Sequence, residues 1–158
     1  MTFHLITLFP GALDSYLGES ILKRAIEDKK RKVKFYNPRD FAEDKHDRVD
    51  RKPFGGGPGM VIQALPVIRA IESAHSYILQ NVGMTKSKLR GTKKQTKVIQ
   101  TRNHKLQTRT IWLTPNGKQF TNEYAKKLAG NCKDTIIICG RYEGIDARVK
   151  KVFKVEEI

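Results

Sequence analysis

One short segment of the sequence gathers side chains that could grip or polarise a ligand. Gly140-Arg141-Tyr142-Glu143-Gly144 places a cation, a phenol and a carboxylate between two glycines, directly after an apolar run. Charged groups in a turn after a buried strand are natural candidates for substrate binding or proton handling. A structural salt-bridge cluster is the alternative interpretation. No Ser-His-Asp or Cys-His arrangement accompanies the turn, which argues against acyl transfer.

A second segment, residues 53–60, could let the backbone approach a ligand closely. It contains Gly55, Gly56, Gly57, Pro58 and Gly59, and glycines permit positive φ and close contact. No Gly-Lys-Ser/Thr follows, so it is not a P-loop, and the GxGxxG spacing of a dinucleotide site is absent. A flexible linker is the alternative, but the flanking prolines stiffen the segment.

Two further segments are less informative. Leu113-Thr114-Pro115-Asn116-Gly117 is a tight turn after a strand and, taken alone, is only a turn. Residues 44–51 mix His and Asp with Lys and Arg, which favours a solvated charged loop over a metal site. No Cys/His cluster has zinc spacing. We therefore predict no metal site.

Hydrophobic periodicity predicts the elements that position these segments. Apolar runs predict strands at 3–9, 33–36, 110–113 and 135–139, and a last short strand at 152–155. Helical spacing predicts helices at about 13–30, 65–77 and 122–128, the last stopped by Gly130-Asn131. Alternating strands and helices indicate a single α/β domain. In open α/β sheets, ligands bind outside the carboxyl ends of the strands, where two of these segments fall.

Composition narrows the class of partner. Lys and Arg number 31 against 16 Asp and Glu, giving a formal net charge of +15. Such a charge attracts RNA, DNA or an anionic membrane surface, although solubility alone is the alternative. Two cysteines, Cys132 and Cys139, in no CxxC motif favour a reduced chain in the cytoplasm. The first residues lack the basic region of a signal peptide, and no apolar stretch approaches the length of a membrane helix.

Taken together, the segments resemble the bacterial tRNA (guanine-N1)-methyltransferases, the TrmD family of the SPOUT class. The matching pieces are LITLFP at the start, NPRDF at 37–41, PFGGGPGM at 53–60, LTPNGK at 113–118 and GRYEGIDARV at 140–149. They keep the family's order and span nearly the whole chain. No single piece is specific, but the combination is.

The resemblance implies a parallel sheet flanked by helices, a trefoil knot, and methyl transfer from S-adenosylmethionine (SAM) to N1 of the guanosine 3′ of the anticodon, position 37. Leu113, Thr114 and Pro115 resemble the loop beside the adenosine, and Gly140, Tyr142 and Gly144 resemble the second cofactor loop. Glu143 resembles the acidic residue that meets the target guanine. The 55–59 loop resembles one that closes near the target base. The family further implies a tRNA partner, a homodimer, and magnesium as a candidate cofactor without a dedicated site.

The sequence also departs from the family. It stops at Ile158, so the resemblance implies an incomplete knot and no third cofactor loop, no general-base Asp with its supporting Arg, and no C-terminal helical domain. We therefore expect the isolated chain to be weakly active or inactive. The alternatives are a non-catalytic basic RNA-binding fragment and another SPOUT-class RNA methyltransferase. Arg51 stands where the family usually has Asp, and Phe54 where it usually has Tyr.

The segment at about 80–108 is a predicted basic insertion, with a β-hairpin expected around Val98-Ile99. No Asp or Glu occurs from Ser73 through Asn122. We expect its cations, among them Lys93, Lys94, Lys97 and Arg102, to contact tRNA phosphates. A disordered basic tether is the alternative.

Overall fold

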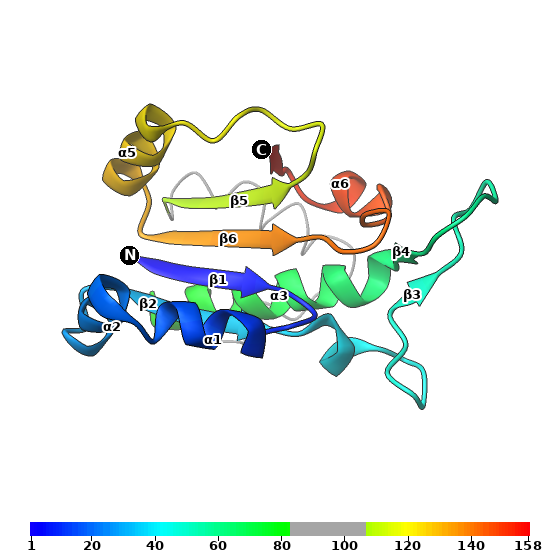
Figure 1. Cartoon of the computed structure of the whole chain (residues 1–158), viewed down its shortest axis with the longest axis horizontal. Coiled ribbons are helices and arrows are strands. Elements are labelled where there is room, and N and C mark those ends of the chain that lie inside the picture. Colours follow the sequence, from blue (N-terminus) through cyan, green and yellow to red (C-terminus); the bar gives the residue numbers. More distant parts are fainter. Residues whose placement is uncertain (83–106) are drawn as a thin grey trace.

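The computed structural model describes residues 1–82 and 107–158 and is built around a five-stranded sheet (Figure 1). Along the sheet the strands lie in the order β2-β1-β6-β5-β7, and every neighbouring pair is parallel. Their bounds are β1 Thr2–Ile6, β2 Lys32–Tyr36, β5 Thr108–Leu113, β6 Asp134–Cys139 and β7 Glu156–Glu157. Because the strands are parallel, all their carboxyl ends meet at one edge.

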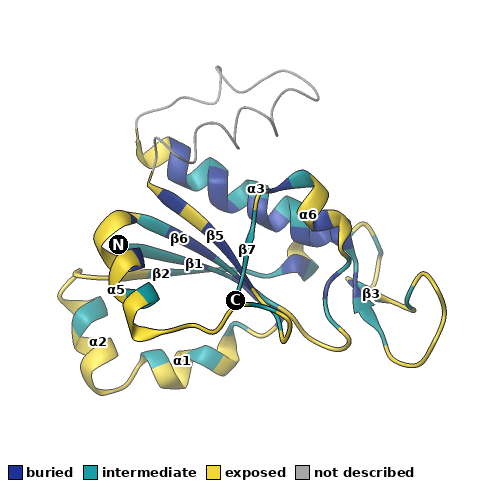
Figure 2. Ribbon diagram, turned by 90° about the horizontal axis from the view of Figure 1, so that it is seen from above, coloured by how far each residue is buried: buried dark blue, intermediate teal, exposed yellow. Residues whose placement is uncertain are grey.

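Helices cover both faces of the sheet (Figure 2). One face carries α3 (Ala64–Asn81) and α6 (Arg148–Val152), and the other carries α1 (Gly11–Leu17), α2 (Ser20–Glu27) and α5 (Asn122–Asn131). A short 3-10 turn, η1 (Pro38–Phe41), follows β2. Two short antiparallel strands, β3 (Asp50–Arg51) and β4 (Val61–Ile62), stand apart from the main sheet.

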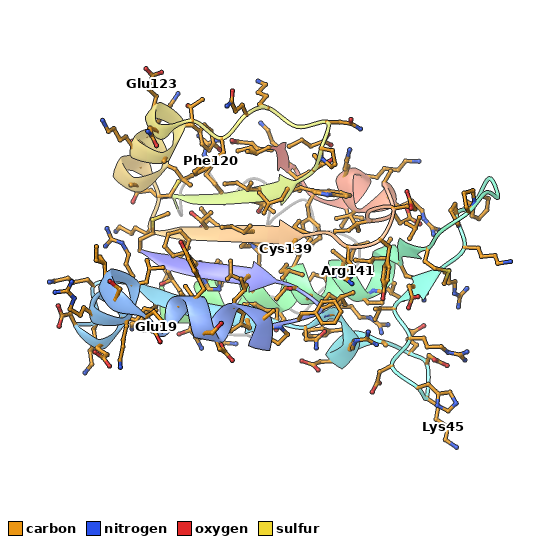
Figure 3. The ribbon with its side chains drawn as sticks, viewed as in Figure 1. Glu19, Lys45, Phe120, Glu123, Cys139 and Arg141 are labelled. Carbon is orange, nitrogen blue, oxygen red and sulfur yellow. The ribbon has the colours of Figure 1, made fainter. Side chains whose placement is uncertain are left out.

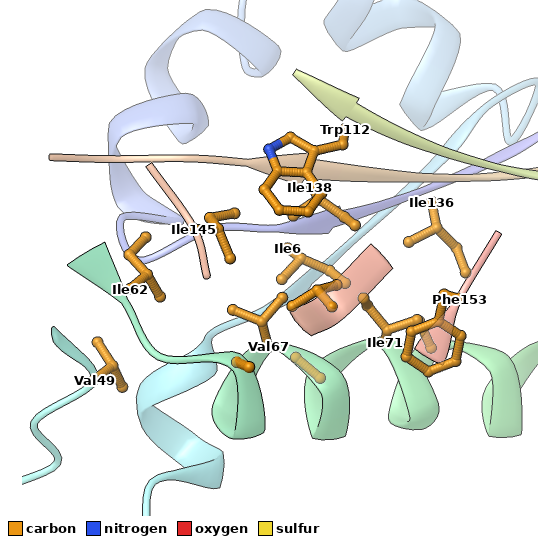
Figure 4. Packing of buried hydrophobic residues seen from close by; sticks show 14 of the residues in the cluster. Ile6, Val49, Ile62, Val67, Ile71, Trp112, Ile136, Ile138, Ile145 and Phe153 are labelled. Carbon is orange, nitrogen blue, oxygen red and sulfur yellow. The ribbon is translucent and has the colours of Figure 1, made fainter. Parts of the chain in front are cut away.

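The main core lies between the sheet and α3 (Figure 4). Helix α3 buries Val67, Ala70, Ile71 and Ala74 completely, which is the spacing of one helix face. Opposite them lie the fully buried side chains of β1 and β6: Ile6, Ile136 and Ile138. Each such aliphatic side chain stabilises the fold by roughly 1.5–3 kcal/mol. The core thereby fixes the sheet that carries the turns.

Two histidines are buried in this layer. The His4 ring, fully buried, lies 3.0 Å from the Tyr36 hydroxyl and 3.2 Å from a carboxylate oxygen of Asp134. His75 stacks on the Phe153 ring, and its Nε2 has no hydrogen-bond partner within the described residues. Burial lowers the pKa of His75 to about 4. Both rings are therefore neutral at physiological pH.

The opposite face is less tightly covered. Helices α1 and α2 contribute no buried residue, and Ile21 of α2 is 70% exposed. Leu128 of α5 and Cys132, the residue after the helix, pack against Ile111 of β5. None of the described helices is both long and apolar enough to cross a membrane.

The structure confirms the α/β class and the four main strands but corrects several boundaries. The predicted helix 13–30 is two helices, because the chain breaks at Gly18 and Ser20 adopts a φ of 49°. Helix α5 does not stop at Gly130 but runs to Asn131. The predicted strand 152–155 is wrong, since α6 ends at Val152 and the strand lies at 156–157.

The predicted insertion is shorter than expected at both ends. Helix α3 continues to Asn81, and β5 begins at Thr108, so the outer residues of the 80–108 segment belong to regular elements. The hairpin expected at Val98-Ile99, and the cations Lys93, Lys94, Lys97 and Arg102, lie outside the described residues.

Candidate functional site

The turn after β5 is held in place by the last strand of the chain. The Thr114 amide donates to the Ile158 carbonyl at 2.8 Å, and the Ile158 amide donates to the Trp112 carbonyl at 3.0 Å. On the other side of β7, the Lys118 amide donates to the Glu157 carbonyl at 3.1 Å. The terminal strand is therefore enclosed between β5 and the returning loop.

Gly117 makes this enclosure possible. A Cβ atom on Gly117 would lie 2.5 Å from the Ile158 nitrogen and 2.6 Å from its Cα. These are backbone atoms and cannot swing away. Glycine is required here for close approach rather than for a left-handed conformation, because Gly117 has no positive φ.

Ion pairs also hold β7. Glu156 accepts hydrogen bonds from the Arg109 guanidinium and from the Tyr124 hydroxyl, both at 2.5 Å. Glu157 pairs with Lys150, whose ammonium lies 5.0 Å from the centroid of the Trp112 ring. Exposed ion pairs contribute little individually. Here they join β7 to β5, α5 and α6 at once.

The turn after β6 begins at Gly140 and has a constrained backbone. Tyr142 has a φ of 60° and Gly144 a φ of 116°, and the Gly144 amide donates to the Arg141 carbonyl at 3.1 Å. The Arg141 guanidinium carbon lies 5.0 Å from the centroid of Phe9, in the loop after β1. Figure 3 shows Arg141 just beyond the end of β6, at the sheet edge. A non-glycine residue in the left-handed region costs about 1–2 kcal/mol, and residues with such strain cluster at active sites and ligand clamps.

The two predicted cofactor turns are neighbours. Leu113 pairs with Cys139 at the ends of β5 and β6, and a Cβ on Gly140 would lie 4.0 Å from the Leu113 carbonyl oxygen. Leu113 and Tyr142 are 44% and 47% exposed. The structure thus brings together Leu113–Pro115 and Gly140–Gly144 as two accessible, backbone-rich walls at the carboxyl edge of the sheet.

The third predicted segment belongs to an arm, residues 44–62, that projects from the start of α3 (Figure 1). The arm is joined to the turn after β6 by backbone hydrogen bonds. The Glu143 amide donates to the Met60 carbonyl at 3.0 Å, and Ile62 exchanges hydrogen bonds with Gly144 and Asp146. The structure therefore places the 55–59 loop beside Glu143.

Gly59 lies directly against the Glu143 side chain. A Cβ on Gly59 would lie 2.5 Å from Glu143 Cγ and 2.8 Å from its Oε1, and Gly59 has a φ of 82°. Gly56 and Gly57 also have positive φ, but nothing within 4 Å surrounds them. The tip of the arm is thus open, whereas its base at Gly59, Met60 and Ile62 contacts the turn after β6.

Between the arm, the start of α3 and residues 143–152 lies an open cleft of about 900 Å³. Its apolar wall includes Ile62, Leu65, Ile68 and Ile145. Its polar and exposed lining residues are Arg51, Lys52, Phe54, Glu143 and Arg148. Glu143 and Ile145 lie between this cleft and the Gly140 turn.

Other charged groups near the site have structural partners. Arg148 donates to both carboxylate oxygens of Asp146, and this contact lowers the Asp146 pKa. In the arm, the Arg48 side chain likewise holds the pKa of Asp44 at about 2. Burial raises the pKa of the Cys139 thiol, which keeps it protonated and unreactive at neutral pH.

Sequence reasoning missed three contributors to the site: Met60, whose carbonyl fixes Glu143; Phe9, which supports Arg141; and Ile158, which supports Thr114. Phe9 lies in LITLFP and Met60 in PFGGGPGM, both of which were noticed only as matching pieces. For Ile158 the sequence carried no local signal, since its role depends on a contact with Trp112 and Gly117 far away in the chain.

The fold and site define a class: a parallel α/β domain with two accessible, backbone-rich turns side by side at the carboxyl edge of its sheet, the edge where ligands of such domains bind. The particular family follows from comparison. A family model described as "tRNA (Guanine-1)-methyltransferase TrmD" matches residues 1–158, and the chain belongs to this family.

Relatives and a solved structure agree. A tRNA (guanine-N(1)-)-methyltransferase of Alkaliphilus oremlandii is 37% identical over 158 residues, which are 100% of this chain and 55% of that protein. One from Clostridioides difficile is 39% identical, again over the whole chain and 57% of the relative. A crystal structure of tRNA (m1G37) methyltransferase from Aquifex aeolicus superposes with a TM-score of 0.69 at 29% identity, covering 99% of this chain and 58% of that one. The chain thus spans about half the length of the relatives it matches.

Proposed function

We propose that this chain provides the cofactor-facing and guanine-facing part of a SAM-dependent tRNA (guanine-N1)-methyltransferase that modifies the guanosine 3′ of the anticodon. The observation that carries the proposal is the junction of three segments at one edge: the Leu113–Pro115 turn, the Gly140–Gly144 turn and the base of the arm at Gly59. The family membership of the chain supports the same activity.

The two turns are suited to a nucleoside. Their walls are formed by backbone and by the exposed side chains of Leu113 and Tyr142, and Gly140 and Gly144 present no side chain to an approaching ligand. In this proposal Leu113, Thr114 and Pro115 lie along the adenosine, while Gly140, Tyr142 and Gly144 form the facing wall. Bound SAM supplies an activated methyl group on a sulfonium.

Glu143 is the residue proposed to meet the base. Its carboxylate can accept hydrogen bonds from N1–H and the N2 amine of guanine, which are both donors in the neutral base. Its amide is fixed to Met60 and its side chain rests on Gly59. The Gly55–Gly59 loop with Pro58 would then line the target base. The protein's task is to align donor and acceptor, because alignment converts a bimolecular encounter into an intramolecular one.

The wider features of the proposal come from the family. The substrate is tRNA, whose target base must leave its stack to reach the site; the active assembly is a homodimer; and the protein works in the cytoplasm. Lys93, Lys94, Lys97 and Arg102 remain candidates for phosphate contacts. The proposal contains no dedicated magnesium site. Over residues 1–82 and 107–158, no group of three or more His, Cys, Asp or Glu side chains is placed to hold a metal ion.

Two measurements test the proposal. Calorimetric titration of the protein with SAM should show binding, and labelled SAM with unmodified tRNA should give methyl incorporation at guanine N1, at the low level expected of this chain by itself. Glu143→Gln should abolish incorporation while leaving SAM binding intact, and the matched control Glu123→Gln on α5, away from the site (Figure 3), should change neither. Absence of SAM binding would contradict the proposal.

A non-catalytic RNA-binding role is a second candidate, because a net charge of +15 supports RNA binding without any turnover. It is favoured if the protein binds tRNA but incorporates no methyl group. Methylation at a ribose oxygen instead of guanine N1 would indicate a different RNA methyltransferase activity.

A further inference from the structure

We propose that a groove along the outer edge of β2 binds the sugar–phosphate backbone of double-stranded RNA, at a place separate from the methyl-transfer site. Strand β2 is the edge of the sheet opposite β7. The groove has a volume of about 540 Å³ and lies between β2 and the second half of α3, and its lining residues include Lys34, Tyr36, Ser73, Ser76, Tyr77 and Gln80. The choice of RNA as the polyanion rests on the proposed function, whereas the phosphate-binding chemistry does not.

The groove is separate from the proposed site. Among the described residues, none lines both this groove and the cleft beside Glu143. Neighbouring strands lie about 4.8 Å apart, so β2 is about 14 Å from β5, whose turn is proposed to hold the adenosine. A contact here therefore involves a different stretch of RNA from the nucleotides around the target guanine.

The first observation is positive charge along one wall of the groove. Lys32 and Lys34 lie two residues apart on β2, so they share a face of the strand. Within the described part of the chain neither forms an ion pair, and of the exposed basic residues 29–31 only Lys30 does, with Asp28. No carboxylate is among the residues that line the groove. The local field therefore attracts an anion.

The spacing of the two lysines suits a chain of phosphates. Residues two apart on a strand are separated by about 6.6 Å, which is close to the separation of neighbouring phosphates in a nucleic-acid strand. Both ammonium groups lie near the Tyr77 hydroxyl. A hydrogen bond with the Asn81 side chain, together with the nearby charges of Lys34 and Lys32, lowers the pKa of Tyr77. The two cations are thus gathered on one part of the groove wall.

The second observation is that the groove is preformed. The His4 ring is fully buried, and its centroid lies 5.8 Å from the ring centroids of both Tyr36 and Tyr77. The Tyr36 hydroxyl lies 3.0 Å from His4 Nδ1, and Asp134 holds the other ring nitrogen at 3.2 Å. Because both tyrosines rest on a buried residue that is itself hydrogen-bonded, binding has little ordering cost.

The third observation is that the aromatic rings of the groove are already covered. The Lys34 ammonium lies 3.8 Å from the centroid of the Tyr77 ring, and the Tyr36 ring packs on His4. Single-stranded RNA is recognised by stacking its bases on open aromatic faces, whereas double-stranded RNA is recognised through its phosphates and 2′-hydroxyls. The groove therefore suits a double-stranded backbone better than unstacked bases.

The polar side chains of α3 complete the surface. Ser73, Ser76 and Gln80 recur at helical spacing along the groove. Their hydroxyl and amide groups can hydrogen-bond phosphate oxygens and ribose hydroxyls. No Ala, Val, Leu, Ile or Met lines the groove, so it lacks the apolar side chains that a membrane-binding surface inserts between lipids. RNA is therefore favoured over an anionic membrane.

The test measures the binding of a fluorescently labelled RNA duplex of unrelated sequence to the full chain, by anisotropy over a range of salt concentrations. Lys34→Gln should weaken binding and lower the slope of log affinity against log salt by about 0.9, the value for one phosphate contact on a double helix. Lys34→Arg keeps the charge and should retain the slope. Lys126→Gln, an exposed lysine on α5, is the matched control and should leave the slope unchanged.

An unchanged slope in Lys34→Gln, or an equal fall in Lys126→Gln, would overturn the inference. Vesicles containing phosphatidylserine test the membrane alternative. If Lys34→Gln lowers vesicle binding but leaves duplex binding intact, the groove is a membrane contact and the inference is wrong. Titration with SAM separates this result from the proposed function. Lys34→Gln should bind SAM as tightly as the unaltered protein, which also shows that it is folded. Absence of SAM binding by the unaltered protein would contradict the proposed function and leave the salt dependence of duplex binding as it stands.

Discussion

The turn after β5 and the arm at 44–62 both present glycines to the proposed site, yet they use them in opposite ways. Gly117 is packed against the backbone of Ile158, with no room for one more atom. Gly56 and Gly57 in the arm have empty space around them and are needed only for their positive φ. The turn after β5 is fixed by close backbone contacts, whereas the tip of the arm is shaped by backbone conformation.

This difference suggests a division of labour. Strand β7 is hydrogen-bonded to β5 on one side and to the loop after β5 on the other, and Trp112 of β5 belongs to the main core. The turn after β5 is therefore held in place and can keep a ligand in one fixed position. The arm is anchored at its base, where Val49 and Ile62 are buried in the main core and where Met60, Ile62 and Gly59 contact the turn after β6, while its tip at Phe54–Gly57 is exposed. Few buried contacts at the tip mean low local stability there, which would suit the proposed role of this loop beside the target base.

The largest effect is expected from adding a methyl group at Gly117, where the backbone of Ile158 leaves no room for it. Gly117→Ala should destabilise the protein by at least about 3 kcal/mol, because the added methyl meets backbone that cannot repack locally. Urea unfolding followed by circular dichroism measures it. Gly130→Ala is the matched control. It lies in helix α5 with nothing within 4 Å, and alanine there should stabilise by up to about 1 kcal/mol.

A double-mutant cycle shows whether Ile158 is the cause. In a chain that ends at Glu157, the Gly117→Ala cost should fall sharply, because the clashing atoms are gone. An undiminished cost in the shortened chain would mean that the enclosure of β7 is not what makes Gly117 necessary.

The next largest effect is expected from acidification. It should destabilise the layer between α3 and the sheet, where His75 is buried, and leave the arm unaffected. The pKa of His75 is lowered to about 4 in the fold, from 6.5, so between these values the unfolded state binds more protons. The contribution of the neutral His75 ring to the free energy of unfolding is fully present above pH 6.5. It falls by about 2–3 kcal/mol as the pH drops towards 4. Burial also lowers the pKa of His4, so this ring adds to the same trend.

Replacing the ring tests this assignment. In His75→Leu the unfolding midpoint should fall much less between pH 7 and pH 4 than in the unaltered protein, because the uptake of one proton on unfolding is lost. Its Nε2 is unpartnered, so losing it should cost little at neutral pH. His46→Leu, on the exposed part of the arm, should leave the pH profile unchanged. The Asp44–Arg48 pair persists over this range, since the pKa of Asp44 is about 2.

Gly59→Ala should have an intermediate effect that falls more on activity than on stability. The left-handed φ costs about 1–2 kcal/mol, and the new methyl must displace the exposed Glu143 side chain. We expect methyl incorporation to fall at least ten-fold while SAM binding is retained. Thermal denaturation and initial rates separate the two effects. Unchanged rates would show that the contact with Gly59 does not position Glu143.

The smallest expected effect is Gly57→Ala. The φ of 104° makes alanine strained, but nothing within 4 Å opposes its methyl group. The cost should be about 1 kcal/mol, which lowers the melting temperature by about 2–4 °C for a domain of this size. Gly57→Ala and Gly59→Ala share the cost of a positive φ, but only Gly59 lies against the Glu143 side chain. A difference between the methylation rates of the two variants therefore isolates the effect of moving Glu143.

The sheet could be predicted from the sequence because its central strands are continuous apolar runs. Ile136, Ile137 and Ile138 form one continuous apolar strand, with Ile136 and Ile138 fully buried and Ile137 partly buried, and composition reveals such a strand directly. The turns could be expected at one edge of the sheet, because each follows a strand and the carboxyl ends of parallel strands lie at the same edge. The resemblance had picked out Glu143 and Gly59, but their contact required the fold.

The errors have local physical causes. Strand β7 consists of two glutamates, which are poor strand formers, and it is held by Arg109, Tyr124 and Lys150 from elsewhere in the chain. Apolar residues at 152–155 suggested the strand, but Val152 ends a helix instead. Gly130 lies within α5 rather than capping it, because the helix continues to Asn131. Long-range contacts decided these positions.

The enclosure of β7 also has a consequence for how the chain acquires its shape. Residues 114–118 leave the ribosome long before residues 156–158, yet the late residues must end up between β5 and the earlier loop. The loop must therefore stay open, or the tail must slip through it, before this edge of the molecule can form. Such a sequence-distant step makes for slow refolding, so the turn after β5 should reach its final position later than the strands β1, β2, β5 and β6.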